Sequence, residues 1–221
     1  MNSVRRNQVP DIAISWTGGI MPRESISRYN GTWGICGFTS ALSHLYTTDV
    51  RLQNQIDTKT PRTIQLGLLV EVLTFLKYVR AFRADLIPGL EVLNKELKSP
   101  LMHLGVEGYI QMADLAVRSK RLIGESNDFQ CALTPEALTL YVQEICGIPT
   151  ATLTSDADPG GQGLLGIMSS QNKLVHWVYR DGGGNVYNWG KVMSSVEWPI
   201  DDDCGLQVEG LHHVGCHVSL V

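Results

Sequence analysis

The chain has 221 residues, of which 43% are hydrophobic and 18% are charged. This composition is typical of a globular protein and excludes a disordered or low-complexity chain. The net charge of −4, from 18 basic and 22 acidic residues, argues against a nucleic-acid-binding protein that works through a broad basic surface. The five cysteines are odd in number and include no C-x-x-C pair, which favours a reduced compartment over a disulfide-rich secreted scaffold.

The sequence predicts helices between residues 38 and 146. Before them, residues 1–29 predict irregular structure with a short extended piece at 11–16, and they carry no apolar signal segment. A glycine-rich stretch, residues 30–37, then leads into a helix, because apolar residues recur at helical spacing from residue 38. Four further helices are predicted after this one, and the last of them opens with the start signal Thr-Pro-Glu-Ala. The five predicted helices cover residues 38–45, 64–82, 91–97, 107–117 and 134–146.

After Pro149 the pattern changes to short strands separated by turns. The predicted strands cover residues 163–168, 173–179, 185–189 and 214–220, and the run Asp181-Gly182-Gly183-Gly184 predicts a hairpin turn. Helices followed by an antiparallel sheet make an α+β fold. We expect one domain over 1–221, in which 1–149 is the mainly helical half and 150–221 the sheet half. No stretch is long and apolar enough to predict a membrane span.

Cys36 lies where a nucleophile would be placed. It stands at the junction between the glycine-rich loop and the predicted helix, where free N–H groups and the helix dipole favour a thiolate. The glycines before it allow a close approach of a substrate to the backbone. A buried structural cysteine is the alternative interpretation of the same position.

A nucleophilic cysteine needs a base, and His176 on the predicted strand 173–179 offers one. In an antiparallel pair a residue near Asn188 can face this histidine, and its amide oxygen would orient the imidazole. Asp181 is the second choice for this role, although it sits at the turn. His103 is the rival base.

These residues resemble the papain-like cysteine peptidases. The stretch from Asn30 to Cys36 is similar to the family's Q-G-S-C-G-S-C motif, with the same spacing of six between the amide side chain and the nucleophile. His176 followed by Asn188-Trp189-Gly190 is similar to the family's histidine and its N-S-W-G motif. The start Cys-Gly-Phe-Thr also resembles the C-G-P-T of bacterial papain-like peptidases that process double-glycine leaders. The resemblance covers about 35 residues in two islands, in the family's order Cys, His, Asn.

The resemblance implies an α+β papain-like fold, in which a nucleophile helix and a helical region pack on a C-terminal antiparallel sheet. It implies that Cys36 attacks, His176 carries the proton, Asn188 orients His176, and Asn30 helps to form the oxyanion hole. Asn30 replaces the family's glutamine and is one methylene shorter. The family's disulfide-bonded cysteine falls on Trp33, so this is not a secreted disulfide-bonded papain.

The implied activity is cysteine-dependent hydrolysis of an amide bond in a protein or peptide. The leaving amine decides between a peptidase and a Gln/Asn deamidase, and an acceptor amine in place of water would make the enzyme transglutaminase-like. A peptidoglycan amidase and a non-enzymatic binding module on a papain-like scaffold are the alternatives. By association, the chain resembles a bacterial effector or toxin, cytoplasmic in the producer and exported without a signal peptide. A cognate immunity or chaperone protein would be its partner.

No cofactor or metal is expected. The acidic run Asp201-Asp202-Asp203-Cys204 and the segment from His212 to His217 contain metal-ligand residue types, but no standard zinc spacing is met. Asp156 to Gly160 resembles a calcium loop in composition only, since the terminal glutamate is missing. Trp177 and Trp189 flank the proposed base and amide, where they would either shield their hydrogen bond from water or pack the sheet.

Overall fold

The computed structural model describes residues 34–57, 59–99, 101–119, 129–155, 158–188, 191–193 and 213–220. Within these residues the helices come first and the antiparallel sheet follows, which confirms the α+β prediction. The helical elements are α2 (Cys36–Thr48), α3 (Val50–Asp57), α4 (Pro61–Phe82), the short 3-10 helix η2 (Ala84–Leu86), α5 (Ile87–Glu96), α6 (Leu101–Ser119), α7 (Pro135–Leu140) and the π-helical turn η4 (Tyr141–Ile145).

Local sequence explains where several of these helices begin. Thr60 caps α4 by accepting a hydrogen bond from the Thr63 backbone N–H, and Thr134 caps α7 in the same way with Ala137. Each cap is followed by a proline in the first turn, where the missing N–H costs nothing. Helix α6 bends at Gly105, whose φ of 62° lies in the left-handed region that glycine adopts without strain.

The sheet has six strands in the order β1-β6-β2-β3-β4-β5, and every neighbouring pair is antiparallel. The strands are β1 (Thr152–Ser155), β2 (Gly163–Met168), β3 (Leu174–Arg180), β4 (Val186–Asn188), β5 (Lys191–Met193) and β6 (His213–Ser219). The predicted hairpin turn at residues 181–184 joins β3 to β4, and the backbone N–H of Asp181 donates to the carbonyl of Asn185.

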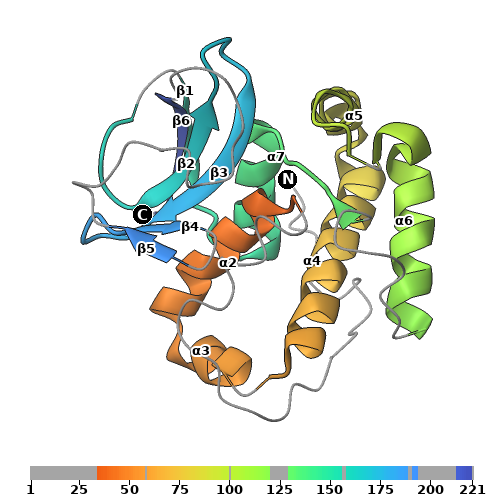
Figure 1. Ribbon diagram of the computed structural model, residues 1–221, viewed down its shortest axis with the longest axis horizontal. Coiled ribbons are helices and arrows are strands. Elements are labelled where there is room, and N and C mark those ends of the chain that lie inside the picture. The colour runs from red at the N-terminus through yellow and green to blue at the C-terminus, as the bar shows by residue number, and fades with distance from the viewer. Residues whose placement is uncertain are drawn as a thin grey trace.

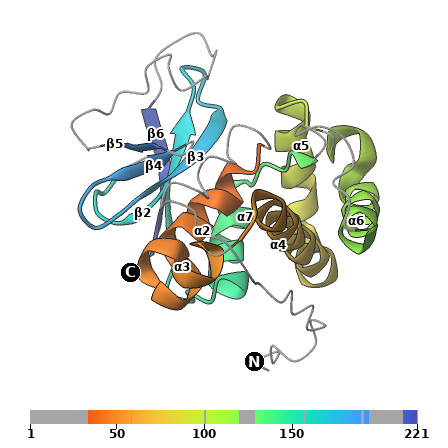
Figure 2. The ribbon, with the colours of Figure 1, turned by 60° about the horizontal axis from the view of Figure 1, so that its bottom comes forward.

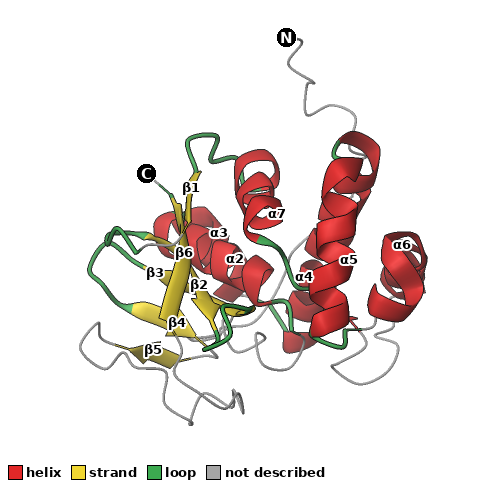
Figure 3. Cartoon of the chain, turned by 90° about the horizontal axis from the view of Figure 1, so that it is seen from above, coloured by secondary structure: helices red, strands yellow, loops and turns green. Residues whose placement is uncertain are grey.

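The described helices lie to one side of the sheet, as Figures 1 and 3 show. Helices α2 and α7 are next to the sheet, α4 lies beyond them, and α6 is farthest away; Figure 2 gives the same order from another side. Trp177 and Tyr179 of β3 belong to the large apolar core between sheet and helices. Val178, between them in sequence, packs in a smaller cluster with Ile167 of β2. Alternation along β3 therefore separates the two faces of the sheet.

The predicted helices and strands are all present, with boundaries that shift by up to six residues. Four elements were not predicted: α3, η2, β1 and β5. The predicted helix 134–146 changes from α-helix to π-helix at Tyr141. In the ranges that the structure describes, no helix combines the length and the apolar character that a membrane crossing needs. The extended piece expected at 11–16 lies outside the described residues.

Candidate functional site

Cys36 is the first residue of α2, so the predicted junction between loop and helix is where the structure places it. The first backbone hydrogen bond of the helix runs from the Thr39 N–H to the Ile35 carbonyl, at 3.1 Å. The backbone N–H groups that come before Thr39 in the first turn therefore have no acceptor within the helix. The Cys36 side chain is buried, with 7% of the residue exposed.

The start of α2 lies against the backbone of β3 at Trp177. Ser40 Oγ, one helical turn after Cys36, donates to the Trp177 carbonyl at 3.1 Å. The Trp177 backbone also acts on Cys36, because it favours the thiolate form of the sulfur. Helix α2 thus satisfies at Trp177 a carbonyl group that a neighbouring strand would otherwise satisfy. Strand β4, which pairs with Tyr179 and Arg180, lies farther along the same strand.

His176 immediately precedes Trp177, and its imidazole is hydrogen-bonded to Asn188. The distance from His176 Nε2 to Asn188 Oδ1 is 2.7 Å, and both residues are buried. Tyr187 of β4 faces Tyr179 of β3, and continuing this register places Asn188 diagonally from His176 on the same face of the sheet. The structure thus brings together the predicted base and the predicted amide.

Asp181, the second choice for orienting the base, is used elsewhere. Its carboxylate accepts hydrogen bonds from the backbone N–H groups of Gly183 and Asn185, from the Asn185 amide and from the Tyr187 hydroxyl. These bonds hold the hairpin turn together. The geometry therefore favours Asn188 over Asp181 as the partner of His176.

Burial dominates the electrostatics of Cys36 and His176. Burial raises the pKa of the Cys36 thiol to about 11, against the opposing effect of the backbone hydrogen bond from Trp177. Burial lowers the pKa of the His176 imidazole to about 4, although the bond to Asn188 favours its charged form. Both shifts favour the neutral thiol and the neutral imidazole at rest. The helix end favours the thiolate form of Cys36, and burial acts in the opposite direction.

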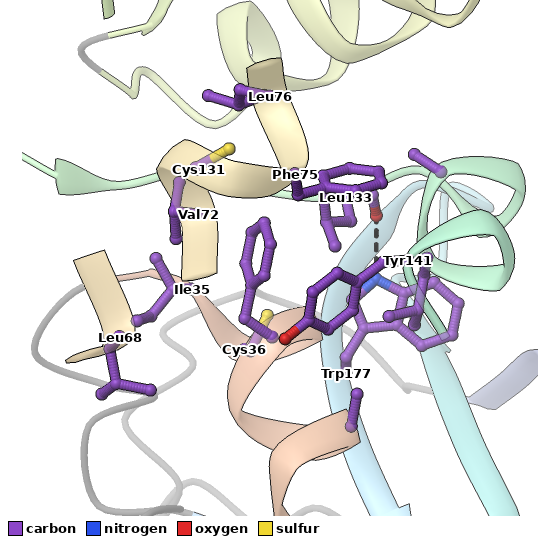
Figure 4. Packing of buried hydrophobic residues seen from close by; sticks show 14 of the residues in the cluster. Ile35, Cys36, Leu68, Val72, Phe75, Leu76, Cys131, Leu133, Tyr141 and Trp177 are labelled. Atoms are coloured by element: carbon purple, nitrogen blue, oxygen red, sulfur yellow. Dashed lines mark hydrogen bonds between the residues drawn. The ribbon is translucent and has the colours of Figure 1, made fainter. Parts of the chain in front are cut away.

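The chain segment 129–134, which we call the strap, runs beside the loop that carries Cys36. A Cβ added to Gly37 would lie 3.3 Å from the Leu133 side chain of the strap. Figure 4 shows Cys131 and Leu133 of the strap in the same apolar cluster as Cys36, with the Trp177 indole bonded to Leu133. That bond runs from Trp177 Nε1 to the Leu133 carbonyl at 2.9 Å. The glycine after Cys36 therefore allows the close approach of the strap.

The strap was not recognisable as part of the site from periodicity, because it follows neither a helical nor a strand pattern. The signal that could have found it is the pair of glycines, Gly34 and Gly37, on either side of Cys36. Each marks a close approach of another segment.

The remaining predicted site residues fall into two groups. Asn30 and Trp189 lie outside the described residues. His103 is exposed on α6, and α4 lies between α6 and α2 in each view, so the arrangement favours His176 as the base. Trp177 packs toward the helices and bonds the strap, which matches its interpretation as a sheet-packing residue.

The residue types that suggested metal ligands are dispersed. His217 is buried and His213 is exposed on β6, whereas Asp158 forms an ion pair with Arg180. Among the residues that the structure describes, no three His, Cys, Asp or Glu side chains are grouped so as to hold a metal ion. The acidic run at 201–204 lies outside those residues.

Comparison with known proteins gives no family for this chain: no protein-family model, no curated protein and no solved structure matches it.

Proposed function

We propose that the protein is a thiol hydrolase of amide bonds with a papain-like arrangement, in which Cys36 is the nucleophile, His176 the general base and Asn188 the residue that orients it. One observation carries the proposal. Ser40, one helical turn after Cys36, donates to the Trp177 carbonyl of β3 at 3.1 Å, and the residue before Trp177 is a histidine bonded to an amide oxygen at 2.7 Å. The helix that begins with Cys36 thus packs on β3 at the residue that follows the proposed base, which supports the assignment.

The hydrogen bond to Asn188 selects the tautomer of the base. Asn188 Oδ1 can only accept a hydrogen bond, so His176 Nε2 is the protonated nitrogen and donates to it. In a neutral imidazole the other nitrogen, Nδ1, then carries the lone pair and is the basic atom. Because burial lowers the pKa of His176 to about 4, the ring is unprotonated at neutral pH.

The proposed reaction follows from these protonation states. As the Cys36 sulfur attacks a carbonyl carbon, its proton passes to His176 Nδ1, and the carbonyl electrons move onto oxygen. When the tetrahedral intermediate collapses, the C–N bond breaks and the amine takes the proton from His176, leaving a thioester on Cys36. Water, deprotonated by the same nitrogen, then hydrolyses the thioester and restores the thiol.

The substrate class within this chemistry is a protein or peptide amide, whether the leaving group is a main-chain amine or ammonia from a side chain. This part of the proposal rests on the resemblance to papain-like peptidases, as does delivery as a bacterial effector or toxin. The cell-wall amidase and transglutaminase-like alternatives use the same three residues.

The test measures the reactivity of Cys36 with p-nitrophenyl acetate, an activated ester that transfers its acetyl group to nucleophilic thiols. Mass spectrometry locates the acetyl group, and release of p-nitrophenol gives the rate. We expect acetylation of Cys36 at about pH 7 and a fall of roughly 100-fold in His176→Ala, which lacks the base. His103→Ala is the matched control, because it removes an exposed histidine on α6, and it should react like the wild type.

Two outcomes would overturn the proposal. Acetylation of Cys36 no faster than that of the buried Cys131 would leave a non-enzymatic binding module, an interpretation that the burial of Cys36 favours. Equal rates in the wild type and in His176→Ala would show that His176 is not the base.

A further inference from the structure

The loop between β1 and β2 is fastened to β3 by Arg180. We call the described part of this loop, residues 158–162, the latch loop. Arg180 Nη1 and Nη2 donate to the two carboxylate oxygens of Asp158 at 2.7 and 2.6 Å, and Arg180 Nε donates to the Gly161 carbonyl at 2.7 Å. Because only 14% of the Arg180 side chain is exposed, this two-pronged ion pair lies largely out of solvent.

The backbone of the latch loop contributes little rigidity of its own. Gly160 and Gly161 have φ values of 78° and 79°, and a Cβ on either would meet no described atom within 4 Å. At the end of the loop, Gln162 Nε2 donates to the Tyr179 hydroxyl at 2.9 Å. The position of the latch loop therefore depends on side-chain bonds at its two ends.

A buried histidine lies against the point where the latch loop enters β2. His217 of β6 is 2% exposed, and neither ring nitrogen has a hydrogen bond of ordinary geometry to a described residue. Its ring lies on the backbone of Gly163, the first residue of β2, where an added Cβ would collide with His217 Nε2. Gly163 pairs with Arg180 in the β2–β3 ladder, so the imidazole lies near the ion pair.

The surroundings of His217 disfavour its protonation while the latch loop is closed. Among the described residues, the charged groups that act on it are Arg180 of β3 and Asp158 of the loop, and the Gln162 backbone carbonyl is a nearby acceptor. Its ladder partners, a threonine of β1 and a leucine of β2, do not titrate. Burial and the Arg180 charge lower the pKa of His217 from its ordinary value of 6.5, against the smaller effects of Asp158 and the carbonyl.

The carboxylate that could neutralise a charged His217 is already engaged. Both oxygens of Asp158 accept from Arg180, so a proton on His217 would set two cations against one carboxylate. Asp158 itself stays ionised in mild acid, because its bonds with Arg180 hold its pKa below the ordinary value of 3.8. His217 is therefore the member of this group that changes charge first as the pH falls.

We propose that acid releases the latch loop from β3 and that His217 is the group whose protonation drives the release. In the closed state the imidazole is neutral, whereas in the open state water reaches it and it binds a proton with its ordinary affinity. The closed state therefore has its full stability above a pH of about 6.5 and loses stability as the pH falls below that value. Each pH unit in this window shifts the closing equilibrium by up to about 10-fold. The proposal is independent of the hydrolase function.

Hydrogen exchange of the full chain at pH 7.5 and 5.0 tests the proposal. Mass spectrometry follows peptides that cover residues 158–163, with rates corrected for the intrinsic pH dependence of exchange. The Gly160 N–H donates to Asp158 Oδ1 at 3.0 Å, so it reports whether the carboxylate is in place. We expect opening of the loop to rise about 10-fold from pH 7.5 to 5.0. His217→Gln, which cannot gain the proton, should hold opening within about 2-fold between the two pH values.

Three further variants separate His217 from its neighbours. His213→Gln is the matched control, because His213 is an exposed histidine of the same strand, and it should keep the wild-type response. His44→Gln should keep it as well, although His44 is buried and its Nδ1 lies 3.1 Å from Gln162 Nε2. Asp158→Asn breaks the ion pair and should leave the loop open at both pH values, which tests the latch even where His217→Gln does not fold.

Four outcomes would overturn the proposal. These are a wild type without an acid-dependent rise, a rise that persists in His217→Gln, a rise that His44→Gln abolishes, and a loop that stays closed in Asp158→Asn. An equal rise in peptides of β3 and β4 would also contradict it, because acid would then loosen the whole sheet and not the latch loop.

Discussion

Asn188 Oδ1 lies 2.7 Å from His176 Nε2, across two strands that a tight turn connects. The turn itself is fixed by Asp181, whose carboxylate accepts from the backbone of Gly183 and Asn185. The position of His176 therefore depends on a locally formed hairpin. In that hairpin Asn188 bonds the imidazole, whereas Asp181 holds the turn.

Replacing Asn188 with alanine should leave His176 without the acceptor that selects its tautomer. We expect Asn188→Ala to slow acetylation of Cys36 by about 100-fold, because part of the imidazole would then carry its proton on the nitrogen that must accept one. Asn188→Asp keeps an acceptor oxygen at the same distance and should retain most of the rate. Asn185→Ala, in the same hairpin, tests for a general effect of loosening the turn, and a loss equal to that of Asn188→Ala would contradict this prediction.

The depressed pKa of His176 should make the folded state sensitive to acid. Between pH 6.5 and about 4 the unfolded chain binds a proton at this position and the folded chain does not, so the free energy of unfolding falls as the pH falls through this window. The full contribution is about 3 kcal/mol. His176→Gln should flatten this part of the stability curve, measured by urea denaturation at several pH values. His103→Gln, at an exposed position, should leave the curve as it is.

Replacing Ser40 with alanine should lower the free energy of unfolding more than replacing Ser43, another buried serine of α2. Ser40 Oγ donates across to the β3 carbonyl of Trp177, whereas Ser43 Oγ donates within α2 to the carbonyl of Thr39. Ser40→Ala leaves a buried carbonyl without its partner and should lower the free energy of unfolding by about 1–3 kcal/mol. Ser43→Ala should cost less, since the Thr39 carbonyl keeps its place in the helical hydrogen-bond pattern. Similar losses in the two variants, measured by denaturant titration, would mean that the contact with β3 adds nothing.

Glu71 should oppose folding as the pH rises. Burial raises the pKa of this carboxyl, although the Tyr141 hydroxyl donates to it at 3.1 Å. The folded state therefore retains a proton that the unfolded chain releases above its ordinary pKa of about 4.5, and stability is greatest below that pH and declines above it. Glu71→Gln keeps an acceptor for Tyr141 and removes the titration. Its stability should exceed that of the wild type at neutral pH, and a lower melting temperature at that pH would contradict the argument.

The parts of the fold that sequence predicted are those with local signals. The pair Thr134-Pro135 marks the start of α7, and Asp181-Gly182 marks the turn that brings β4 back to β3. The same signal at Thr60-Pro61 was overlooked, so the predicted start of α4 at residue 64 came three residues late. The short edge strands β1 and β5 were missed because their pairing depends on partners and not on their own pattern. Helix α3 was missed because its sequence, VRLQNQID, has few apolar residues to show a helical period.

The same division holds at the candidate site. Cys36, His176 and Asn188 were predicted because each follows a local pattern, a loop before a helix or an alternating strand. The contact between Gly34 and Gln130 was not predicted, because the two residues lie far apart in sequence and no nearby residue indicates their contact. The raised pKa of Cys36 was missed for a similar reason, since the helix end is visible in the sequence and the depth of burial is not.

The strand order carries a consequence for folding. Strand β6 (His213–Ser219) lies between β1 and β2. Strands β1 and β2 are close to each other in sequence, whereas β6 follows β2 by about 50 residues. The hairpins β2–β3 and β3–β4 can form from neighbouring residues, while the β1–β6–β2 ladders must wait for a long loop to close. The hairpins that carry His176 and Asn188 are therefore suited to form early, and the other half of the sheet is completed late.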